Sequence, residues 1–591
     1  MKTLPTVRPA APEAPDAAGA PLRQWELVGI LVLVLCWFWL RRASVYNHPW
    51  DSDETQHLHV VWGWTQGLIP YRDFFDNHTP LFHLLFAPVF NLFGERPDIV
   101  DLARWCMVAL AGLVAWCTYR IGAQVFSRRT GIVAALLCAF YPSEYFKTGE
   151  FRTDVLWTVL WLATLVLLTK PRLTRGHRFL AGLTMGAAFA TSQKTVLLML
   201  VLLAGSLLSW LLTLASKRRT AALPDAVRLP SGAFTLSFWL GLVLIPGLLL
   251  TFFYLEGAWS QMLYCVIRHN LIKAPGSEPM LSWSDLRNLR FWLIIPAGVA
   301  GWMILKRSAD RDQAGRQVWL LMVGGSYCTL LLGLWTVVSA QDYLPYYPVA
   351  LTCVTAGLFW LGRRIVRRLP GHPWVPPLLL AIVFGVEISW LVKSVHFSDR
   401  RNQFRVEQIR EVLALTSPDE PVLDAKGGSV YRLRSIPYVM ETLTRLRMRE
   451  GLLENDITER LIARRTVVAI NLSWFPGATQ NFINRNYLYI GLVHVAGKQL
   501  QGATNGSAPV PFSIEIPSRY VFVDAAGLVP GRLDGGQPGD RFEVASGDHS
   551  FQPGRPLTGA CYILAESAYD AGFTPSNREL QALEPLRKVI N

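Results

Sequence analysis

Charged residues are scarce in this chain. Only 17% of its 591 residues are Asp, Glu, Lys or Arg, whereas 51% are hydrophobic and 22 are Trp. Soluble globular domains carry about 25% charged residues, so this composition excludes a soluble protein of several domains. We therefore expect an α-helical protein that crosses a membrane many times.

Close cysteine pairs and a continuous basic surface are also missing. The eight cysteines are scattered mostly through apolar segments without a Cys-x-x-Cys motif, which argues against a disulfide framework or a zinc site. The formal net charge is +14, but Lys and Arg occur in short clusters between apolar segments. Nucleic-acid binding is therefore not expected.

Long apolar segments dominate the first two thirds of the chain. About eleven of them approach the length of about twenty residues that a transmembrane helix needs. They lie near Trp25–Leu40, Ile99–Tyr119, Gly131–Phe146, Val155–Thr169, Phe179–Thr191, Val196–Ala215, Phe234–Tyr254, Phe291–Leu305, Val318–Val338, Leu344–Leu361 and Trp374–Val392. The shorter Leu81–Phe93 segment contains His83 and Pro88 and is predicted to lie on the membrane surface.

Basic clusters occupy every second connection between these segments, as the positive-inside rule requires. This pattern predicts a cytoplasmic N-terminus and an extracytoplasmic C-terminal region, in a bacterial inner (plasma) membrane. The loop over residues 43–98 would face outward. Arg41 and Arg42 would then lie on the outer side, which counts against the scheme.

The chain divides into four predicted parts. Residues 1–24 are rich in Ala and Pro and are expected to be disordered. Residues 25–395 would form the transmembrane domain. Charged residues, Gly and alternating apolar positions then replace the long apolar segments, which predicts a soluble α/β module over 396–500 and a β-rich module over 501–591.

A dense group of ionisable residues follows the first apolar segment. It contains Asp53, Glu54 and His57, and a second group with Asp76 and His78 follows about twenty residues later. Such residues are costly beside lipid unless they serve a site. An exposed carboxylate is usually only solvated, and Asp154, at the start of a later segment, would also suit a helix N-cap.

Several ordered motifs resemble those of the GT-C membrane glycosyltransferases, especially the group of aminoarabinose transferase and protein O-mannosyltransferases. The motifs are Asp53-Glu54, Gly67-Leu-Ile-Pro-Tyr-Arg-Asp-Phe-Phe-Asp-Asn-His-Thr-Pro80, Arg152-Thr-Asp154 and Tyr343-Leu-Pro-Tyr-Tyr-Pro348. The resemblance covers about the first 395 residues. It implies transfer of a sugar from a polyprenyl-phosphate donor to a lipid, glycan or protein acceptor on the outer face.

The resemblance also implies roles for particular residues. Asp53 would act as general base or beside it, with Glu54 next to it and Asp154 lining the same cavity. Candidates for binding substrate or phosphate are His57, Tyr71, Asp76, His78, Lys194, Arg268, His269 and Tyr346. Many relatives carry Lys-Pro-Pro where this chain has His78-Thr-Pro80.

Chemistry supports a base and a cation in such a site, because the acceptor hydroxyl must lose a proton while the phosphate departs. Lys194 is a candidate for the phosphate, although a lysine at a helix end often only extends to the membrane surface. Asp53, Asp154, His57 and His78 are candidate ligands of a divalent metal, Mg, Mn or Zn. The histidines would alternatively make hydrogen bonds or contact phosphate.

Two other classes of function compete with the enzyme. A transporter or flippase of lipid-linked glycans would place charges inside its crossings and show inverted repeats, which are not evident here. A membrane receptor or scaffold would act through its C-terminal region.

Overall fold

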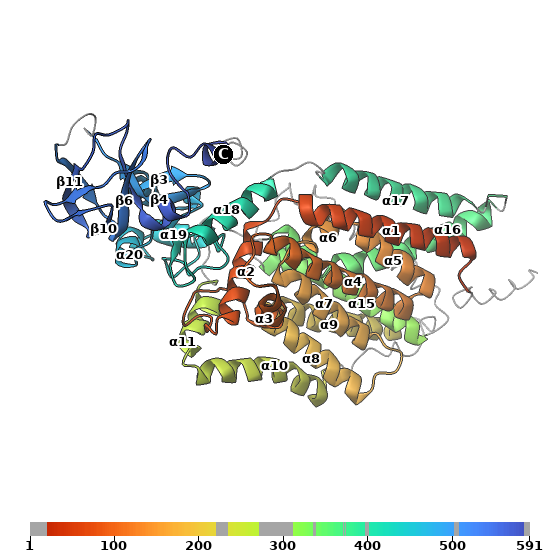
Figure 1. The fold of residues 1–591 in the computed structure, drawn as a ribbon. Coiled ribbons are helices and arrows are strands. Elements are labelled where there is room, and N and C mark those ends of the chain that lie inside the picture. Colours follow the sequence, from red (N-terminus) through yellow and green to blue (C-terminus); the bar gives the residue numbers. More distant parts are fainter. Residues whose placement is uncertain are drawn as a thin grey trace, which may run out of the picture.

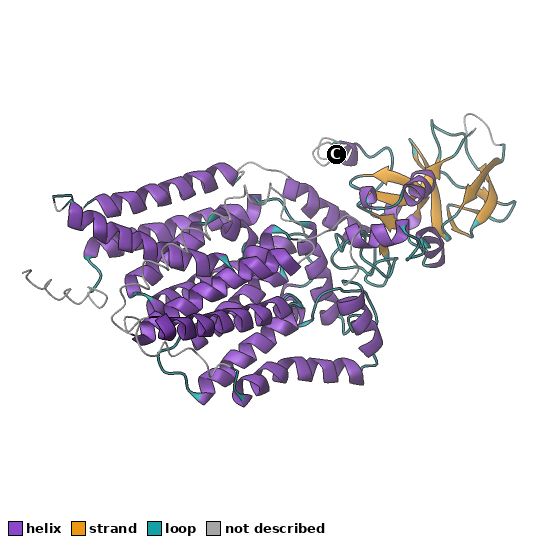
Figure 2. Cartoon of the chain, turned by 180° about the vertical axis from the view of Figure 1, so that it is seen from behind, coloured by secondary structure: helices purple, strands orange, loops and turns teal. Residues whose placement is uncertain are grey.

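A computed structural model describes residues 21–219, 234–270, 311–334, 338–369, 371–372, 374–395, 401–501 and 508–583. Long helices form a bundle, and the C-terminal region lies against one end of it (Figure 1). The strands gather in that C-terminal region (Figure 2). We refer to this end of the bundle as the capped end.

The bundle is built from long apolar helices. They are α1 (Gln24–Asn47), α4 (Ile99–Val125), α5 (Arg128–Phe140), α6 (Pro142–Lys147), α7 (Thr153–Leu168), α8 (Arg175–Thr191), α9 (Thr195–Arg219), α10 (Leu236–Leu255), α15 (Arg311–Leu334), α16 (Tyr347–Arg368) and α17 (Val375–Ser394). Within the described residues, six helices are long and apolar enough to cross a membrane: α1, α4, α9, α10, α16 and α17. The chain is thus a helical polytopic membrane protein.

Every apolar segment predicted to cross the membrane contains an α-helix where the structure describes it. The Phe291–Leu305 segment and most of the predicted tail over 1–24 lie outside the described residues. The Gly131–Phe146 segment is divided into α5 and α6, because Tyr141 is extended and Pro142 occupies the first turn of α6. Proline lacks the N–H that a helix interior requires.

Short helices collect at the capped end (Figure 1). Between α1 and α4 the chain forms α2 (Ser52–Thr65) and α3 (Leu81–Phe93), the latter at the position of the predicted surface helix. After α10 come α11 (Trp259–Met262) and the π-helix η2 (Leu263–Arg268), and the 3₁₀-helix η3 (Ala340–Tyr343) precedes α16.

The C-terminal region combines helices with two sheets. Its helices are α18 (Arg401–Leu415), α19 (Thr442–Arg449), α20 (Ile457–Ala463), η4 (Leu472–Trp474), α21 (Gly477–Asn486), α22 (Glu566–Asp570) and α23 (Arg578–Gln581). Its strands are β1 (Val422–Leu423), β2 (Val468–Ala469), β3 (Tyr487–Ile490), β4 (Val493–Gln499), β5 (Val510–Ile514), β6 (Ser518–Asp524), β7 (Gly527–Leu528), β8 (Gly531–Leu533), β9 (Pro538–Gly539), β10 (Arg541–Val544), β11 (Gly547–Pro553) and β12 (Tyr562–Ala565).

The larger sheet runs through both predicted C-terminal modules. Its order is β1-β2-β4-β12-β6-β10, with β3 on β4 and β7 on β6, and the smaller sheet has the order β5-β11-β8-β9. Strand β4 pairs antiparallel with β12, so Lys498 lies opposite Ile563. The predicted division at residue 500 therefore falls inside one continuous sheet.

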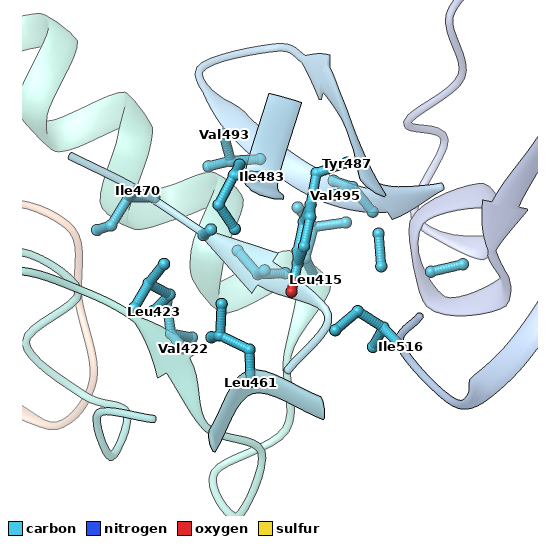
Figure 3. Packing of buried hydrophobic residues seen from close by; sticks show 14 of the residues in the cluster. Leu415, Val422, Leu423, Leu461, Ile470, Ile483, Tyr487, Val493, Val495 and Ile516 are labelled. Carbon is cyan, nitrogen blue, oxygen red and sulfur yellow. The ribbon is translucent and has the colours of Figure 1, made fainter. Parts of the chain in front are cut away.

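A continuous apolar core joins this region to the capped end. Leu423, Leu461 and Val495 pack together inside it (Figure 3). The same cluster extends to Tyr71 and Phe75 before α3, and to Phe253 of α10. The C-terminal region thus buries its apolar surface on the capped end of the bundle as well as within itself.

Candidate active site

Helix α2 begins at the capped end with a reciprocal cap. The Asp51 carboxylate accepts a hydrogen bond from the Asp53 amide at 2.9 Å, and Glu54 accepts one from the Asp51 amide at 2.9 Å. This capping box satisfies amide groups that the first turn of a helix leaves unpaired. It also fixes the directions in which Asp53 and Glu54 leave the helix.

Glu54 points into the protein. Its carboxylate is fully buried and accepts two hydrogen bonds from the Arg104 guanidinium of α4, at 2.8 and 2.6 Å. Its Oε1 also accepts the Phe151 amide at 2.9 Å. Glu54 therefore ties α2 to α4 and to the loop before α7, with no oxygen directed at a substrate.

Arg152, the residue after Phe151, reaches the other acid of the pair. Its Nη2 lies 2.6 Å from Asp53 Oδ2, and its Nε lies 3.5 Å from Asp154 Oδ2. Lys194, between α8 and α9, lies 3.0 Å from Asp154 and 2.5 Å from Asp342. Carboxylates and cations therefore alternate from α2 across to η3.

The row of charges ends on the C-terminal region. Lys426, from the loop after β1, forms an ion pair with Asp53. Asp53 thus has a cation on each side, although 25% of its side chain remains exposed. Burial raises the pKa of Asp53, but Arg152 and Lys426 outweigh burial and hold that pKa well below its usual range, so the carboxylate is ionised.

A second cluster, of histidines, lies beside this row. His57 and His83 share a hydrogen bond of 3.0 Å between ring nitrogens, and His78 donates to Asp76 at 2.9 Å. Burial lowers the pKa of His83 to about 4, so its ring is neutral. Burial lowers the pKa of His78, but the hydrogen bond and charge of Asp76 outweigh burial and raise that pKa. The His78 side chain is 30% exposed.

The remaining predicted residues lie at different depths. Tyr71 is buried, and its hydroxyl donates to the His78 carbonyl at 2.6 Å. His269 lies 3.3 Å from Glu441 of the C-terminal region, while Arg268 is exposed at the end of η2. Tyr346 is buried among helices and stacks on Tyr327, so no face of it is open beside the charged row.

The predicted metal ligands do not converge. Within the ranges that the structure describes, no three His, Cys, Asp or Glu side chains are grouped so as to hold a metal ion. Asp53 and Asp154 are separated by Arg152, which pairs with both, and His57 is bonded to His83. The residues present therefore do not fit a divalent metal site, which the sequence offered as one of two alternatives for these residues.

Comparison with known proteins gives a family match over part of the chain and a similar fold over most of it. Residues 77–255 match the family of dolichyl-phosphate-mannose-protein mannosyltransferases. The fold is similar to that of ArnT from Cupriavidus metallidurans bound to undecaprenyl phosphate. The similarity covers 80% of this chain and 97% of the ArnT chain, with 13% identity and a TM-score of 0.54. In this match and in its fold, the chain is similar to the GT-C membrane glycosyltransferases.

Other solved structures agree less closely with this chain. The apo form of the same ArnT covers the same shares with 12% identity and a TM-score of 0.50. Archaeal oligosaccharyltransferase AglB from Archaeoglobus fulgidus gives a TM-score of 0.44 at 11% identity, over 76% of this chain and 70% of its own. No curated protein sequence matches. The family match over residues 77–255 favours the enzyme over the transporter and scaffold hypotheses.

Sequence reasoning missed three charged residues of this site. Arg152 belongs to the Arg152-Thr-Asp154 motif, but no role was predicted for it. Asp342 lies directly before the motif that begins at Tyr343. Lys426 follows a segment that reads as a buried strand, in Asp424-Ala-Lys-Gly-Gly, which is a signal for a functional turn. Its position 373 residues from Asp53 hid their contact.

Proposed function

We propose that this protein is a glycosyltransferase that moves a sugar from a polyprenyl-phosphate-linked donor to an acceptor hydroxyl, with Asp53 as general base. The observation that best supports this proposal is the exposure of the Asp53 side chain. Its side chain is 25% exposed, whereas those of Asp154 and Asp342 are 6% and 3% exposed. Asp51 is open too, but its Oδ1 is occupied as the helix cap. An acceptor can therefore reach Asp53.

The reaction needs one proton acceptor and one stabilised leaving group. Asp53 takes the proton of the acceptor hydroxyl while that oxygen bonds to the anomeric carbon of the sugar. The bond from this carbon to the phosphate oxygen breaks, and the polyprenyl phosphate leaves with one more negative charge. A positioned base contributes about 10²–10⁴-fold to such a rate.

Cations beside Asp53 suit the departing phosphate. Arg152 offers a planar set of donors next to the base, and Lys194 keeps 23% of its side chain exposed further along the row. Donors placed where charge develops stabilise the transition state. His78, whose pKa is raised by Asp76, would supply a further positive group near Asp53 when it is protonated.

The proposed orientation follows the positive-inside pattern, with about eleven crossings of the bacterial inner membrane, a cytoplasmic N-terminus and an extracytoplasmic capped end. Arg41, which counted against it, is buried. Its guanidinium donates to the Tyr145 carbonyl at 2.5 Å and to Thr148 at 2.6 Å. Because it serves internal hydrogen bonds, Arg41 carries no weight as a loop charge, whereas Arg42 is exposed and still counts against this orientation.

The test uses purified full-length protein with a panel of hexosyl and pentosyl polyprenyl phosphates and with lipid, glycan and peptide acceptors. Acceptor-dependent release of polyprenyl phosphate from one donor is the expected result. Asp53→Asn should lower this rate by about 10²–10⁴-fold, and the exposed Arg410→Gln variant serves as a control. Full activity of folded Asp53→Asn would contradict the role of Asp53.

A further inference from the structure

Hydrogen bonds within the loop that carries Lys426 fix its backbone conformation. Asp424 accepts hydrogen bonds from the amides of Lys426 at 2.9 Å and Ser429 at 2.5 Å. Gly427 follows with φ +82°, a conformation that favours glycine. This turn directs the lysine side chain away from the sheet and toward α2.

The same loop is seated directly on α2. A Cβ atom on Gly427 would lie 2.9 Å from His59 Cβ and 3.1 Å from the Thr55 carbonyl oxygen, so only glycine allows this approach. Burial lowers the pKa of His59 to about 4, and its neutral ring donates from Nδ1 to the Val430 carbonyl at 2.9 Å. The loop therefore has a defined place on the helix that carries Asp53.

Contacts on several sides hold the whole C-terminal region in register. Asn402 of α18 donates to the carbonyls of Tyr46 and His48 at 2.9 Å. Arg432 pairs with Glu95 at 3.0 Å, and Arg447 donates to the His269 carbonyl at 3.1 Å. Lys426, only 14% exposed, thus reaches Asp53 from a fixed platform.

From this geometry we propose that Lys426 is a positioning residue of the active site, shared between Asp53 and the phosphate of the donor. Before the donor binds, Lys426 neutralises Asp53, and it turns toward the phosphate when the donor arrives. The C-terminal region therefore completes the site. This inference rests on the function proposed above.

Asp53 and the donor phosphate are both negatively charged, so they compete for the Lys426 cation. The Asp53 carboxylate faces Arg152 from the loop before α7, Lys426 from the loop after β1 and His78 from the segment before α3. Asp51, next to it at the helix cap, shares Arg152 at 3.4 Å. A phosphate attracts a lysine or arginine at least as strongly as one carboxylate does. Movement of Lys426 to the phosphate leaves Asp53 with one cation fewer and makes it a stronger base.

Removal of Lys426 should change the pH profile in a defined direction. Loss of a neighbouring cation raises the pKa of Asp53 toward its usual range. Because Asp53 must be ionised to act as a base, the acid limb of kcat/KM should then move to higher pH. A residue that only held the domains together would lower the rate without this displacement.

The experiment measures undecaprenyl phosphate affinity and the pH profile of sugar transfer in full-length protein. Lys426→Gln should weaken binding about tenfold and move the acid limb to higher pH, while Lys426→Arg should preserve both. Asp53→Asn should strengthen undecaprenyl phosphate binding several-fold when Lys426 is present, because the substitution frees that lysine. In the Asp53→Asn, Lys426→Gln double variant the gain in affinity should be smaller. Arg410→Gln, which removes an exposed cation from α18, is the matched control.

Unchanged affinity and an unchanged acid limb in folded Lys426→Gln would overturn the inference. If that variant does not fold, loss of binding in folded Lys426→Arg would overturn it equally. The proposed function fails separately, when wild-type protein releases no carrier phosphate from any donor. Lysine-dependent binding of undecaprenyl phosphate would in that case still support the contact between Lys426 and phosphate.

Discussion

The Glu54 carboxylate accepts a hydrogen bond from the Phe151 amide at 2.9 Å, and the next residue, Arg152, lies 2.6 Å from Asp53. Two adjacent acids on one helix therefore have different tasks. Glu54 holds the loop before α7 through the Phe151 amide, and Asp53 pairs with Arg152 of the same loop. The buried ion pair between Glu54 and Arg104 anchors the arrangement.

Loss of the Glu54 charge should destabilise the protein strongly. Glu54→Gln leaves Arg104, which is 1% exposed, without a counter-charge, and breaking a buried pair on one side costs about 3–5 kcal/mol. The measurement is the thermal unfolding midpoint in detergent, with Arg410→Gln as an exposed control. An unchanged midpoint for Glu54→Gln would show that Arg104 finds another partner.

Lys194 should contribute to both stability and phosphate binding, and a double variant separates the two. Lys194→Gln leaves Asp154 and Asp342 without the cation that they share, at 3.0 and 2.5 Å. We expect a lower unfolding midpoint and about tenfold weaker undecaprenyl phosphate binding. Added Asp342→Asn should restore part of the midpoint but none of the affinity. Restored affinity would contradict a phosphate contact by Lys194.

The pair of His78 with Asp76 should make stability depend on pH. Because this pair raises the pKa of His78, its stabilisation is fully present below about pH 6.5 and is lost as pH rises through the raised value. The difference in unfolding midpoint between wild type and His78→Gln should therefore shrink from pH 5.5 to 8.5. Exposed His372→Gln is the control. A constant difference would exclude the charged pair.

Sugar transfer should persist when divalent metals are removed. Asp53 and Asp154 both pair with Arg152, and in the described part of the chain no three candidate ligands converge. We expect the rate in excess EDTA to stay within about twofold of the untreated rate, since the cations of the site are side chains. Abolition by EDTA with recovery on adding Mg, Mn or Zn would refute this expectation.

The helical membrane class could be predicted because it depends on local composition. Apolar segments of sufficient length form helices wherever they cross a bilayer, which satisfies the backbone within one segment. The break at Pro142 was missed, since Gly131–Phe146 was taken as one segment, although proline disfavours a helix interior. The extent of the larger sheet could not be predicted, since β4 and β12 are far apart in the sequence and pair only after folding.

Asp53 was singled out from the sequence as a site candidate, but the distinction from Glu54 came from packing. Adjacent residues on a helix point about 100° apart, so the sequence shows only that one acid can face a site. Arg104, 50 residues away, decides which acid is buried. The histidines show the same limit: their pattern suggested metal ligands, whereas in the folded chain His57 is hydrogen-bonded to His83 and His78 to Asp76.

Composition, apolar length and ordered motifs are properties of neighbouring residues, and they suffice for the membrane class, the family resemblance and the first candidate acid. The alternation of Lys426, Asp53, Arg152, Asp154, Lys194 and Asp342 is a property of tertiary structure alone. Its members come from separate helices and from the C-terminal region. Charges interact through distance in space, and only the folded chain brings these six side chains within reach of one another.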